Sequence, residues 1–424
     1  MNLKNINNLF LLIILSPFLI SCSMKDLMNK ENLNIDLVES DIIETTYFIE
    51  ETSFNQKSEL LDFYNRNNNF HWEESTKLKK IYDISFGNKS DKGLTNLSNL
   101  IISNNFAYYV DSETKFIKLD LNEMKKVFEI HLVEKIDSNL TLPTSLAKSK
   151  DYFFVGLRNG IVIKFDNDGK IYWKKDFNDL LRTPIRIVND NIILIFNSNK
   201  IISLNSSNGR MIWEFNYKLN KPSLSTGGQI LIKHNLVFFV MPNGKIGAID
   251  TIVGEPVDHP FLKSFIQKNI LNYNCEAKFH IYNKLLSLVE DKNIIYTYDS
   301  DNEKFLLFNE KIYSSKSINF LNNSLLILES NNLLKSYNLI NNFVFWKVDL
   351  SKFLSTKDKI VESYVINDSI LIFFSTGKIL QLNKLNGKIL FKQDLNLNDI
   401  DLVTVKDDYF IFNQSNGKVY FYRQ

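Results

Sequence analysis

The sequence contains few of the residues on which several common protein classes depend. Its 424 residues include 14 Gly, 7 Pro and 2 Cys. So few glycines disfavour a glycine-rich nucleotide-binding enzyme, and two cysteines cannot form a disulfide framework. Lys and Arg number 50 against 48 Asp and Glu, so there is no basic excess to bind a phosphate backbone, and nucleic acid is not expected as a partner.

Aromatic and apolar residues are abundant instead. There are 33 Phe and 18 Tyr, and hydrophobic residues make up 44% of the chain. Aromatic side chains are enriched in β-strands, so the composition favours a strand-rich core and excludes a disordered or collagen-like chain. A chain of this length can form two or three ordinary domains or one large closed β architecture.

Residues 1–21 have the features of a secretory signal. Lys4 supplies a positive charge, and residues 9–20 (LFLLIILSPFLI) form an apolar run that is too short to span a membrane as a helix. Cys22 follows Leu19-Ile20-Ser21 directly, and this order of an apolar residue, a small residue and Cys resembles the bacterial lipobox. The resemblance implies cleavage before Cys22 and attachment of lipid to it. The alternative is an ordinary signal with an incidental cysteine.

The residue after the lipobox cysteine bears on the expected location. In the lipobox family an Asp at that position tends to retain a protein in the inner membrane, and Ser23 stands there in this chain. The resemblance therefore implies a lipid anchor in the outer membrane. Residues 22–69 are polar with no sustained period, which predicts a lipidated tether, and residues 70–424 are expected to fold.

The remainder of the chain repeats. The segment NGIVIKFDNDGKIYWKK at 159–175 is similar to NKIISLNSSNGRMIWEF at 199–215, and further copies occupy 332–348 and 376–393. Each copy contains a strand, a turn with Asp or Asn and Gly, and a second strand that ends in an aromatic residue. Because Asn, Asp and Gly tolerate positive φ in tight turns, the two strands are predicted to pair antiparallel.

A ladder of aromatic residues gives the period of the repeat. Successive ladder positions lie 39 to 49 residues apart, and each interval has room for four strands, which is the size of a β-propeller blade. A large aromatic side chain on the outermost strand is predicted to seal the boundary with the next blade. The predicted ladder residues are Tyr82, Phe128, Trp173, Trp213, Trp346 and Phe391. Asp258 and Leu307 occupy ladder positions without an aromatic ring, so the fourth and fifth blades are expected to be less regular.

The two ends of the repeat region complement each other. The last copy, at 416–424, lacks a fourth strand, whereas residues 78–86 read as a single strand one period before Phe128. Pairing of these segments leaves no blade incomplete. The predicted fold is therefore an all-β, eight-bladed β-propeller of four-stranded blades, closed by pairing of the N-terminal strand with the C-terminal blade.

Signals of catalytic chemistry are weak. No two of the histidines have metal-ligand spacing. The segment Asp166–Gly169 has a carboxylate pattern similar to a calcium loop, but the twelfth position is Phe177 instead of an acid, so a turn is expected. Cys275 has no second cysteine nearby and is predicted to be an incidental thiol. No metal and no cofactor are therefore expected, and the chain is predicted not to be an enzyme.

The repeat pattern NGxIxxxDxxxGKxxW, matched best at 159–173 and 199–213, resembles the pyrroloquinoline-quinone-like propeller repeat. Combined with the lipobox, the tether and the final NGKVYFYR, it resembles the BamB family of outer-membrane barrel-assembly lipoproteins. The resemblance implies a scaffold that docks on the periplasmic domains of the central barrel subunit, together with companion lipoproteins. It also admits unfolded outer-membrane proteins as ligands, because a partner can add a strand to an exposed sheet edge.

In that family two inter-blade loops carry the docking residues. One reads approximately Pro-Ser-Leu-Ser-Leu-Arg-Gly, and the aligned stretch here is 222–228 (PSLSTGG), in which Leu224 matches while the second Leu and the Arg are replaced. The other loop carries a pair of acids, aligned here with Asn274 and Glu276. The resemblance thus implies that Leu224 and Glu276 contact the partner.

Three other functional classes remain open on the sequence alone, and one of them is a purely structural role in the cell envelope. A lipid-anchored propeller that binds a sugar or a peptide would present a pocket of Trp and acidic residues, for which only Trp72 lies outside the ladder. A quinone-dependent dehydrogenase would carry adjacent cysteines and calcium ligands, and neither is visible.

Overall fold

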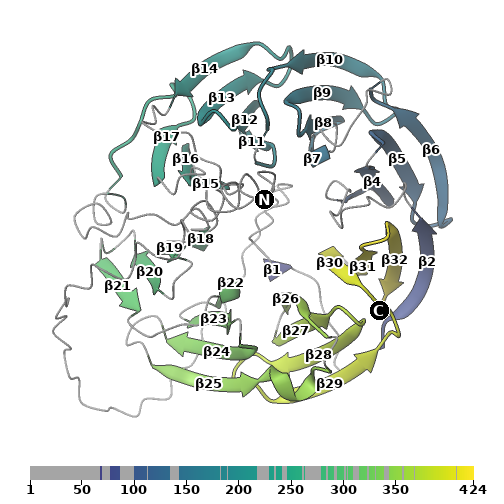
Figure 1. The fold of residues 1–424 in the computed structure, drawn as a ribbon, viewed down its shortest axis with the longest axis vertical. Helices are drawn as coiled ribbons and strands as arrows, with labels where there is room; N and C mark the ends of the chain where they lie inside the picture. Colours follow the sequence, from purple (N-terminus) through teal and green to yellow (C-terminus); the bar gives the residue numbers. More distant parts are fainter. Residues whose placement is uncertain are drawn as a thin grey trace, which may run out of the picture. The chain divides into compact units, whose positions relative to one another are not determined.

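The computed structural model describes residues 67–68, 77–85, 100–133, 143–216, 229–262, 278–338 and 343–424, with short gaps inside several of these ranges. The chain divides into two compact units, Met1–Gln56 and Lys57–Gln424, and every described residue lies in the second. This second unit is all-β (Figure 1), with 32 strands and one short 3-10 helix, η3 (Leu350–Phe353), in its described part.

The described strands form eight sheets, which we number in chain order. Sheet 1 contains β3 (Ile101–Ser103), β4 (Phe106–Val110), β5 (Lys115–Asp120) and β6 (Lys125–His131). Sheet 2 contains β7 (Pro143–Ser149), β8 (Tyr152–Leu157), β9 (Ile161–Asp166) and β10 (Ile171–Asp176). Sheet 3 contains β11 (Arg186–Val188), β12 (Asn191–Ile195), β13 (Lys200–Asn205) and β14 (Met211–Asn216). Sheet 4 contains β15 (Gln229–Lys233), β16 (Leu236–Val240) and β17 (Ile246–Asp250).

The second half of the unit continues this arrangement. Sheet 5 contains β18 (Lys278–Tyr282), β19 (Leu285–Glu290), β20 (Ile294–Asp299) and β21 (Lys304–Phe308). Sheet 6 contains β22 (Ser315–Leu321), β23 (Ser324–Glu329), β24 (Leu333–Asn338) and β25 (Val344–Asp349). Sheet 7 contains β26 (Ile360–Ile366), β27 (Ser369–Phe374), β28 (Lys378–Asn383) and β29 (Ile389–Asp394). Sheet 8 contains β30 (Ile400–Lys406), β31 (Tyr409–Gln414), β32 (Lys418–Arg423) and β2 (Lys79–Ser85).

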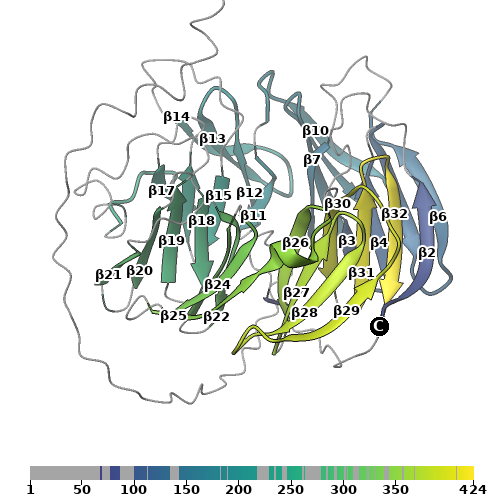
Figure 2. The ribbon, with the colours of Figure 1, turned by 60° about the horizontal axis from the view of Figure 1, so that its bottom comes forward.

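The final sheet joins segments that are far apart in the sequence. β2 pairs antiparallel with β32, from Lys79 opposite Arg423 to Ser85 opposite Lys418, and Figure 2 shows the two strands side by side. Tyr82 packs on Phe421 with ring centroids 6.3 Å apart. The pairing expected between residues 78–86 and the end of the chain is therefore present.

Hairpin turns explain why strands that follow each other in a sheet pair antiparallel. Between the third and fourth strands the turn begins at Asp or Asn, whose side chain accepts backbone N–H groups from the turn, and ends at a residue with positive φ. The turn glycines are Gly169, Gly209, Gly254 and Gly387, with φ of +81°, +68°, +77° and +68°. Met124 takes this position in sheet 1 with φ of 50°.

Neighbouring sheets share buried side chains. Clusters of core residues join sheet 1 to sheet 2, sheet 2 to sheet 3, sheet 3 to sheet 4, sheet 6 to sheet 7, sheet 7 to sheet 8, and sheet 8 to sheet 1. β18 of sheet 5 lies against β15 and β16 of sheet 4. No such cluster of described residues joins sheets 5 and 6. The core is therefore a succession of sheet-to-sheet boundaries rather than one centre.

The two ladder positions without an aromatic ring, Asp258 and Leu307, belong to sheets of different regularity. Sheet 4 has three strands in its described part. Beyond β17, the carbonyl of Glu255 accepts the N–H of Asp250, the N–H of Val257 donates to the carbonyl of Ala248, and Pro256 forms an isolated bridge with Ile249. These two hydrogen bonds flank Pro256, so its ring nitrogen faces the outer edge, where the missing N–H leaves no bond to β17 unmade. Sheet 5, in contrast, has four strands, and Leu307 in β21 lies opposite Tyr296. The expected irregularity of the fifth blade is thus wrong for its backbone.

One short strand was not predicted. β1 (Asn67–Asn68) pairs parallel with β26, so that sheet 7 has five strands, and the registers are Asn67 with Val365 and Asn68 with Ile366. These two residues fall in the segment predicted as a tether, where a polar sequence without a period gives no strand signal.

Candidate functional site

The residues predicted to attach lipid and to contact a partner are Cys22, Leu224 and Glu276. All three, and Trp72, lie outside the described residues. Their roles remain predictions. The described part of the chain instead shows how the ladder residues build the boundaries between sheets.

Each predicted ladder residue lies on the last strand of its sheet. Trp173, Trp213 and Trp346 lie on β10, β14 and β25. Their indole Nε1 atoms donate hydrogen bonds to backbone carbonyls of the next sheet, those of Ser206 at 3.1 Å, Thr251 at 3.0 Å and Lys384 at 3.2 Å. In all three cases the acceptor is the second residue of the turn between the third and fourth strands of that next sheet. The ring thus buries apolar area and also satisfies its N–H group.

The turn glycine makes this contact possible. A Cβ atom on Gly209 would lie 3.0 Å from Trp173, one on Gly254 2.5 Å from Trp213, and one on Gly387 2.6 Å from Trp346. Gly therefore meets two requirements at these turns, positive φ and the close approach of an indole ring. The best buried of the three rings is that of Trp213, which is 8% exposed.

The other ladder residues make contacts of a different kind. Phe128 packs on Phe116 of its own sheet with ring centroids 5.9 Å apart, and it is Ile130, two residues further along β6, that meets Gly169 of sheet 2. Phe391 lies on β29, and Gln393, two residues further, faces sheet 8. The position two residues after the ladder residue is therefore a second contact with the next sheet, which the sequence analysis missed.

Gln393 is bound to the start of β2. Its Oε1 atom accepts from the backbone N–H of Leu78 at 2.9 Å, and its Nε2 atom donates to the carbonyl of Leu78 at 2.9 Å. Sheet 8 has no hairpin turn between β32 and β2, because the two strands come from distant parts of the sequence. At the tryptophan boundaries the indole ring binds the turn of the next sheet. Here the Gln393 side chain of sheet 7 binds the backbone of Leu78 instead.

A β-bulge precedes the ladder residue on each of six outermost strands. The pairing skips one residue immediately before Tyr82, Phe128, Trp173, Trp213, Trp346 and Phe391. Five of the skipped residues are large, apolar and exposed, and these are Val127 (45%), Tyr172 (48%), Ile212 (44%), Phe345 (50%) and Leu390 (39%). A bulge breaks the strict alternation of faces, which places an inward ring next to an outward apolar side chain.

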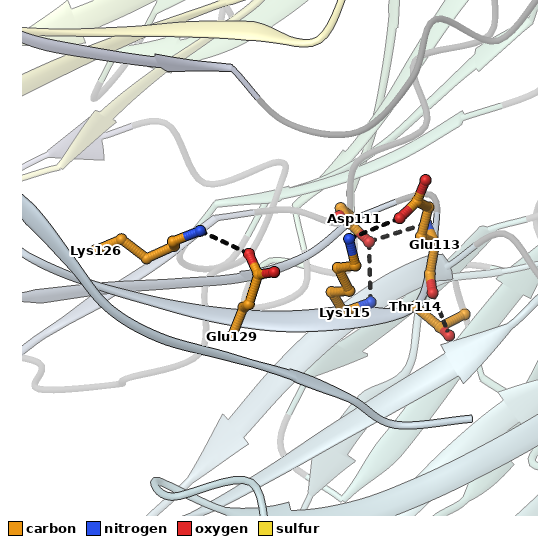
Figure 3. A network of polar contacts seen from close by, with 6 residues as sticks. All are labelled: Asp111, Glu113, Thr114, Lys115, Lys126 and Glu129. Atoms are coloured by element: carbon orange, nitrogen blue, oxygen red, sulfur yellow. Dashed lines mark hydrogen bonds and ion pairs between the residues drawn. The ribbon is translucent and has the colours of Figure 1, made fainter. Parts of the chain in front are cut away.

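Polar side chains also bind the turn between the second and third strands of sheet 1, β4 and β5. In sheet 1 the buried Oδ1 of Asp111 accepts from the backbone N–H groups of Glu113 and Lys115, both at 2.9 Å (Figure 3). The Glu113 carboxylate pairs with Lys115 at 2.7 Å. Burial raises the pKa of Asp111, whereas the hydrogen bond from Lys126 lowers the pKa of Glu129. The contacts of Asp111 and Glu113 order the β4–β5 turn, whereas the pair of Lys126 and Glu129 lies on β6.

The third strands of sheets 1 and 2 each carry a lysine whose side chain lies against aromatic rings. Lys164 is 6% exposed, and its Nζ lies 3.9 Å from the ring centroid of Tyr152. Lys118 lies opposite Phe128, and its Nζ is 4.5 Å from the ring centroid of Phe106. Burial lowers the pKa of Lys164. Cation–π contact compensates part of the desolvation of such a cation.

Asp358, in the loop before β26, forms an ion pair in sheet 7. Its side chain is fully buried, pairs with Lys378 at 2.7 Å and accepts the backbone N–H of Ser355 at 2.8 Å. Despite burial, the hydrogen bond from Lys378 and those of the loop hold the pKa of Asp358 well below its usual value of 3.8.

We expect Asp358→Asn to lower the free energy of unfolding at pH 7 by about 2 kcal/mol, since Lys378 is 35% exposed and keeps part of its hydration. A group with a depressed folded-state pKa stabilises above its unfolded pKa and loses that contribution as the pH falls. The difference between the two proteins should therefore shrink below about pH 4 in urea titrations. A difference that stays constant down to pH 2 would contradict this assignment.

The described residues form neither a metal site nor a membrane-spanning helix. Within the described ranges, no group of three His, Cys, Asp or Glu residues could hold a metal ion. In the same part of the chain no helix is long and apolar enough to cross a membrane. The described residues do form packed boundaries between successive sheets, and these boundaries position the loops and edges of the sheets.

Comparison with known proteins supports a specific class. The family model described as "Outer membrane protein assembly factor BamB" matches residues 138–347. A curated protein of that name from Nitrosomonas eutropha is 20% identical over 155 residues, which are 37% of this chain and 36% of that protein. The chain thus matches little more than a third of the length of that relative.

Solved structures support the fold. The crystal structure of BamB from Moraxella catarrhalis matches with a TM-score of 0.60 and 16% identity, over 82% of this chain and all of that one. Sqt1 from Saccharomyces cerevisiae matches with 0.59 and 10% identity over the same share of this chain and all of that one. A quinohemoprotein alcohol dehydrogenase from Pseudomonas putida HK5 matches with 0.55 and 9% identity, over 82% of this chain and 76% of that one.

Repeated four-stranded antiparallel sheets and propeller-like structural neighbours define an all-β repeat protein. The repeat signature, the family model and the structural match agree on one branch of this class. The chain is a BamB-like protein built of pyrroloquinoline-quinone-like repeats.

Proposed function

We propose that this protein is a non-enzymatic scaffold lipoprotein of the machinery that assembles β-barrel proteins in the outer membrane. The observation that carries the proposal is the match of the BamB family model to residues 138–347, in a fold that resembles a BamB crystal structure over 82% of the chain. At this level of identity the structural match supports the fold, and the family model supports the role.

The eight sheets are the blades of a closed propeller in this proposal. The pairing of β2 with β32 and the contacts of Gln393 support closure at sheet 8. Shared cores from sheet 6 through sheets 7, 8, 1, 2 and 3 to sheet 4 support a continuous succession of blades. A closed arrangement leaves only short edges to water, which suits a rigid platform for other proteins.

The N-terminal segments place the platform on the membrane. In the proposal residues 1–21 are removed, Cys22 carries the lipid and residues 22–69 tether the propeller on the periplasmic side of the outer membrane. We expect metabolic labelling with radioactive palmitate to be lost in Cys22→Ala. The matched control is Cys275→Ala, which should label normally. Label that persists in Cys22→Ala would contradict the anchor.

Docking on the periplasmic domains of the central barrel subunit is assigned to the loops that contain Leu224 and Glu276. We expect Leu224→Asp to weaken capture of that subunit by about tenfold or more, because a charge in an apolar contact leaves an unpaired desolvated group. Met211→Asp is the control, since Met211 is 57% exposed and lies on a sheet edge outside the proposed loops. Equal capture by both variants would remove the assignment of Leu224.

Companion lipoproteins and unfolded outer-membrane proteins are the further partners of the proposed complex. The last strands of the sheets supply the physical means, because each has an edge with no neighbouring strand among the described strands. Such an edge binds an extended segment through main-chain hydrogen bonds.

A further inference from the structure

Arg186, the first residue of β11, is a buried cation. It is 8% exposed, and its Nε atom is enclosed without a hydrogen-bond partner. Among the described residues, no carboxylate forms an ion pair with it. A guanidinium keeps its proton under ordinary conditions, so deprotonation cannot relieve the burial of its charge. A cation in this position is expected to have an anionic partner.

The other buried charged residues in the described part of the chain all have partners. Four buried acids have hydrogen-bond or ion-pair partners, and these are Asp111, Asp299, Glu329 and Asp358. The second buried cation, Lys164, lies over the ring of Tyr152 with its Nζ atom 3.9 Å from the centroid. Within the same ranges Arg186 has neither a carboxylate nor an aromatic ring to compensate its charge.

Strand pairing places Arg186 on the face of sheet 3 that meets sheet 4. A row of four side chains crosses sheet 3, in which Arg186 lies opposite Ile193, Ile193 opposite Ser203, and Ser203 opposite Trp213. Residues directly opposite each other share a face of a sheet, and Ile193 and Trp213 pack with core residues of sheet 4. β11 and β14 are the two edges of sheet 3 (Figure 1), so Arg186 and Trp213 lie at opposite ends of this boundary.

The equivalent rows of other sheets begin with a side chain that is apolar or hydrogen-bonded. In sheets 1 and 2 the first-strand residue of the row is Ile101 or Ala147. In sheet 7 it is Tyr364, whose hydroxyl group donates to the carbonyl of Val403 in sheet 8 at 2.6 Å. A polar group at this position can therefore be satisfied by the next sheet, and no described residue of sheet 4 does this for Arg186.

Carboxylates are scarce around this boundary. Residues 215–249, which run from the end of sheet 3 almost to the end of sheet 4, contain no Asp or Glu. Glu214 lies opposite a residue that packs with sheet 2, so it occupies the other face of sheet 3. Asp190 pairs with a lysine of sheet 2 at 3.8 Å, and Asp250 accepts a backbone N–H group of its own turn. The acid-free segment includes Lys218, Lys221, Lys233 and Lys245.

We propose that Arg186 is the cation of an oxyanion-binding site at the boundary between sheets 3 and 4, and that the ligand carries a carboxylate or a phosphate group. A guanidinium presents parallel N–H donors that match the oxygens of both groups. The small exposed fraction of Arg186 favours a single compact group over a flat surface such as a bilayer. The site depends on sheets 3 and 4 alone and not on the proposed scaffold role.

An oxyanion at Arg186 would strengthen the contact between the two sheets. Trp213 binds the turn of sheet 4 at the β14 end of the boundary, and the anion would neutralise the buried charge at the β11 end. A ligand that binds only the folded protein stabilises it in proportion to the occupancy of its site. The stability of the protein should therefore depend on the concentration of such an anion.

The test is thermal unfolding of the purified full chain in sodium chloride, sodium phosphate and sodium glutarate at equal pH and ionic strength. We expect phosphate or glutarate to raise the Tm of the wild type in a saturable way, by about 2–4 °C more than that of Arg186→Met. The comparison removes the general effect of phosphate on stability, which acts on both proteins. Arg210→Met is the matched control, because Arg210 is exposed in the turn before β14, and it should respond as the wild type does.

The two anions identify the chemistry of the ligand. Stabilisation by both supports a general oxyanion site, whereas stabilisation by phosphate alone or by glutarate alone assigns the site to that group. An equal rise of Tm in the wild type and Arg186→Met, or no saturable rise with either anion, would overturn the site. Arg186→Gln is a second uncharged variant in case Arg186→Met does not fold. Calorimetric titration of each anion into the wild type measures binding without any variant, and absence of heat with both anions would also overturn the site.

Discussion

Trp213→Ala is expected to lower the free energy of unfolding by about 3–5 kcal/mol, which is the range for removal of a buried indole. Trp213 is 8% exposed, packs against the turn glycine Gly254 and donates to the carbonyl of Thr251 at 3.0 Å. Truncation leaves a cavity between sheets 3 and 4 and an unpaired carbonyl. Guanidinium titration followed by circular dichroism measures the change.

Two variants at neighbouring positions separate the causes. Trp213→Phe retains a ring and loses only the N–H group and some volume, so about 1–3 kcal/mol is expected. Ile212→Ala changes an exposed side chain on the same strand and should alter stability by less than about 0.5 kcal/mol. A loss for Trp213→Ala no larger than that for Ile212→Ala would mean that the ladder ring does not support the boundary.

The effect should differ between boundaries in a defined way. Trp173 and Trp346 make the same hydrogen bond, but both are less buried than Trp213. Their alanine variants are therefore expected to cost less. Phe128, which packs within its own sheet, gives no N–H group to the next sheet and depends on Ile130 for that contact.

The ladder shows which features of this fold can be predicted from the sequence. The turn residues Asn205 and Gly209 and the aromatic Trp213 act within one hairpin and the turn next to it, so their spacing is preserved in each copy. A local rule that is repeated many times becomes a visible period. The pairing of β2 with β32 could be predicted for the same reason, since the last copy has the pattern of a blade with one strand missing and residues 78–86 have the pattern of a single strand.

Other features of the fold could not be predicted from the sequence, because they depend on residues far away in the chain or on local irregularities of a strand. Nothing in the sequence around Gln393 marks it as the ligand of Leu78, which lies 315 residues away. The exposed residues before each ladder position read as ordinary strand residues, since a one-residue bulge moves a side chain from the inward to the outward face without changing the composition. Asp258 signalled an altered sheet 4, whereas the four regular strands around Leu307 show that an aromatic ring is not required for a strand to form.

The boundary between sheets 7 and 8 depends on Gln393. We expect Gln393→Ala to lower the free energy of unfolding by about 2–4 kcal/mol, because both backbone groups of Leu78 lose their partner and Leu78 is only 4% exposed. Elsewhere a covalent turn holds the last two strands together, and loss of one contact leaves the hairpin intact. β2 has no such turn, so weakening its first residue also favours fraying of the strand from β32.

Matched variants test this explanation. Gln393→Glu keeps an acceptor for the N–H of Leu78 but turns a donor into a negative oxygen facing the Leu78 carbonyl, so it should be no more stable than Gln393→Ala at pH 7. Lys392→Ala alters the exposed neighbour and should have little effect. Hydrogen exchange gives the decisive readout, because amides of β2 should exchange faster in Gln393→Ala while those of β27 keep their protection. Uniform acceleration across both strands would show that Gln393 stabilises the whole unit and has no special role in holding β2.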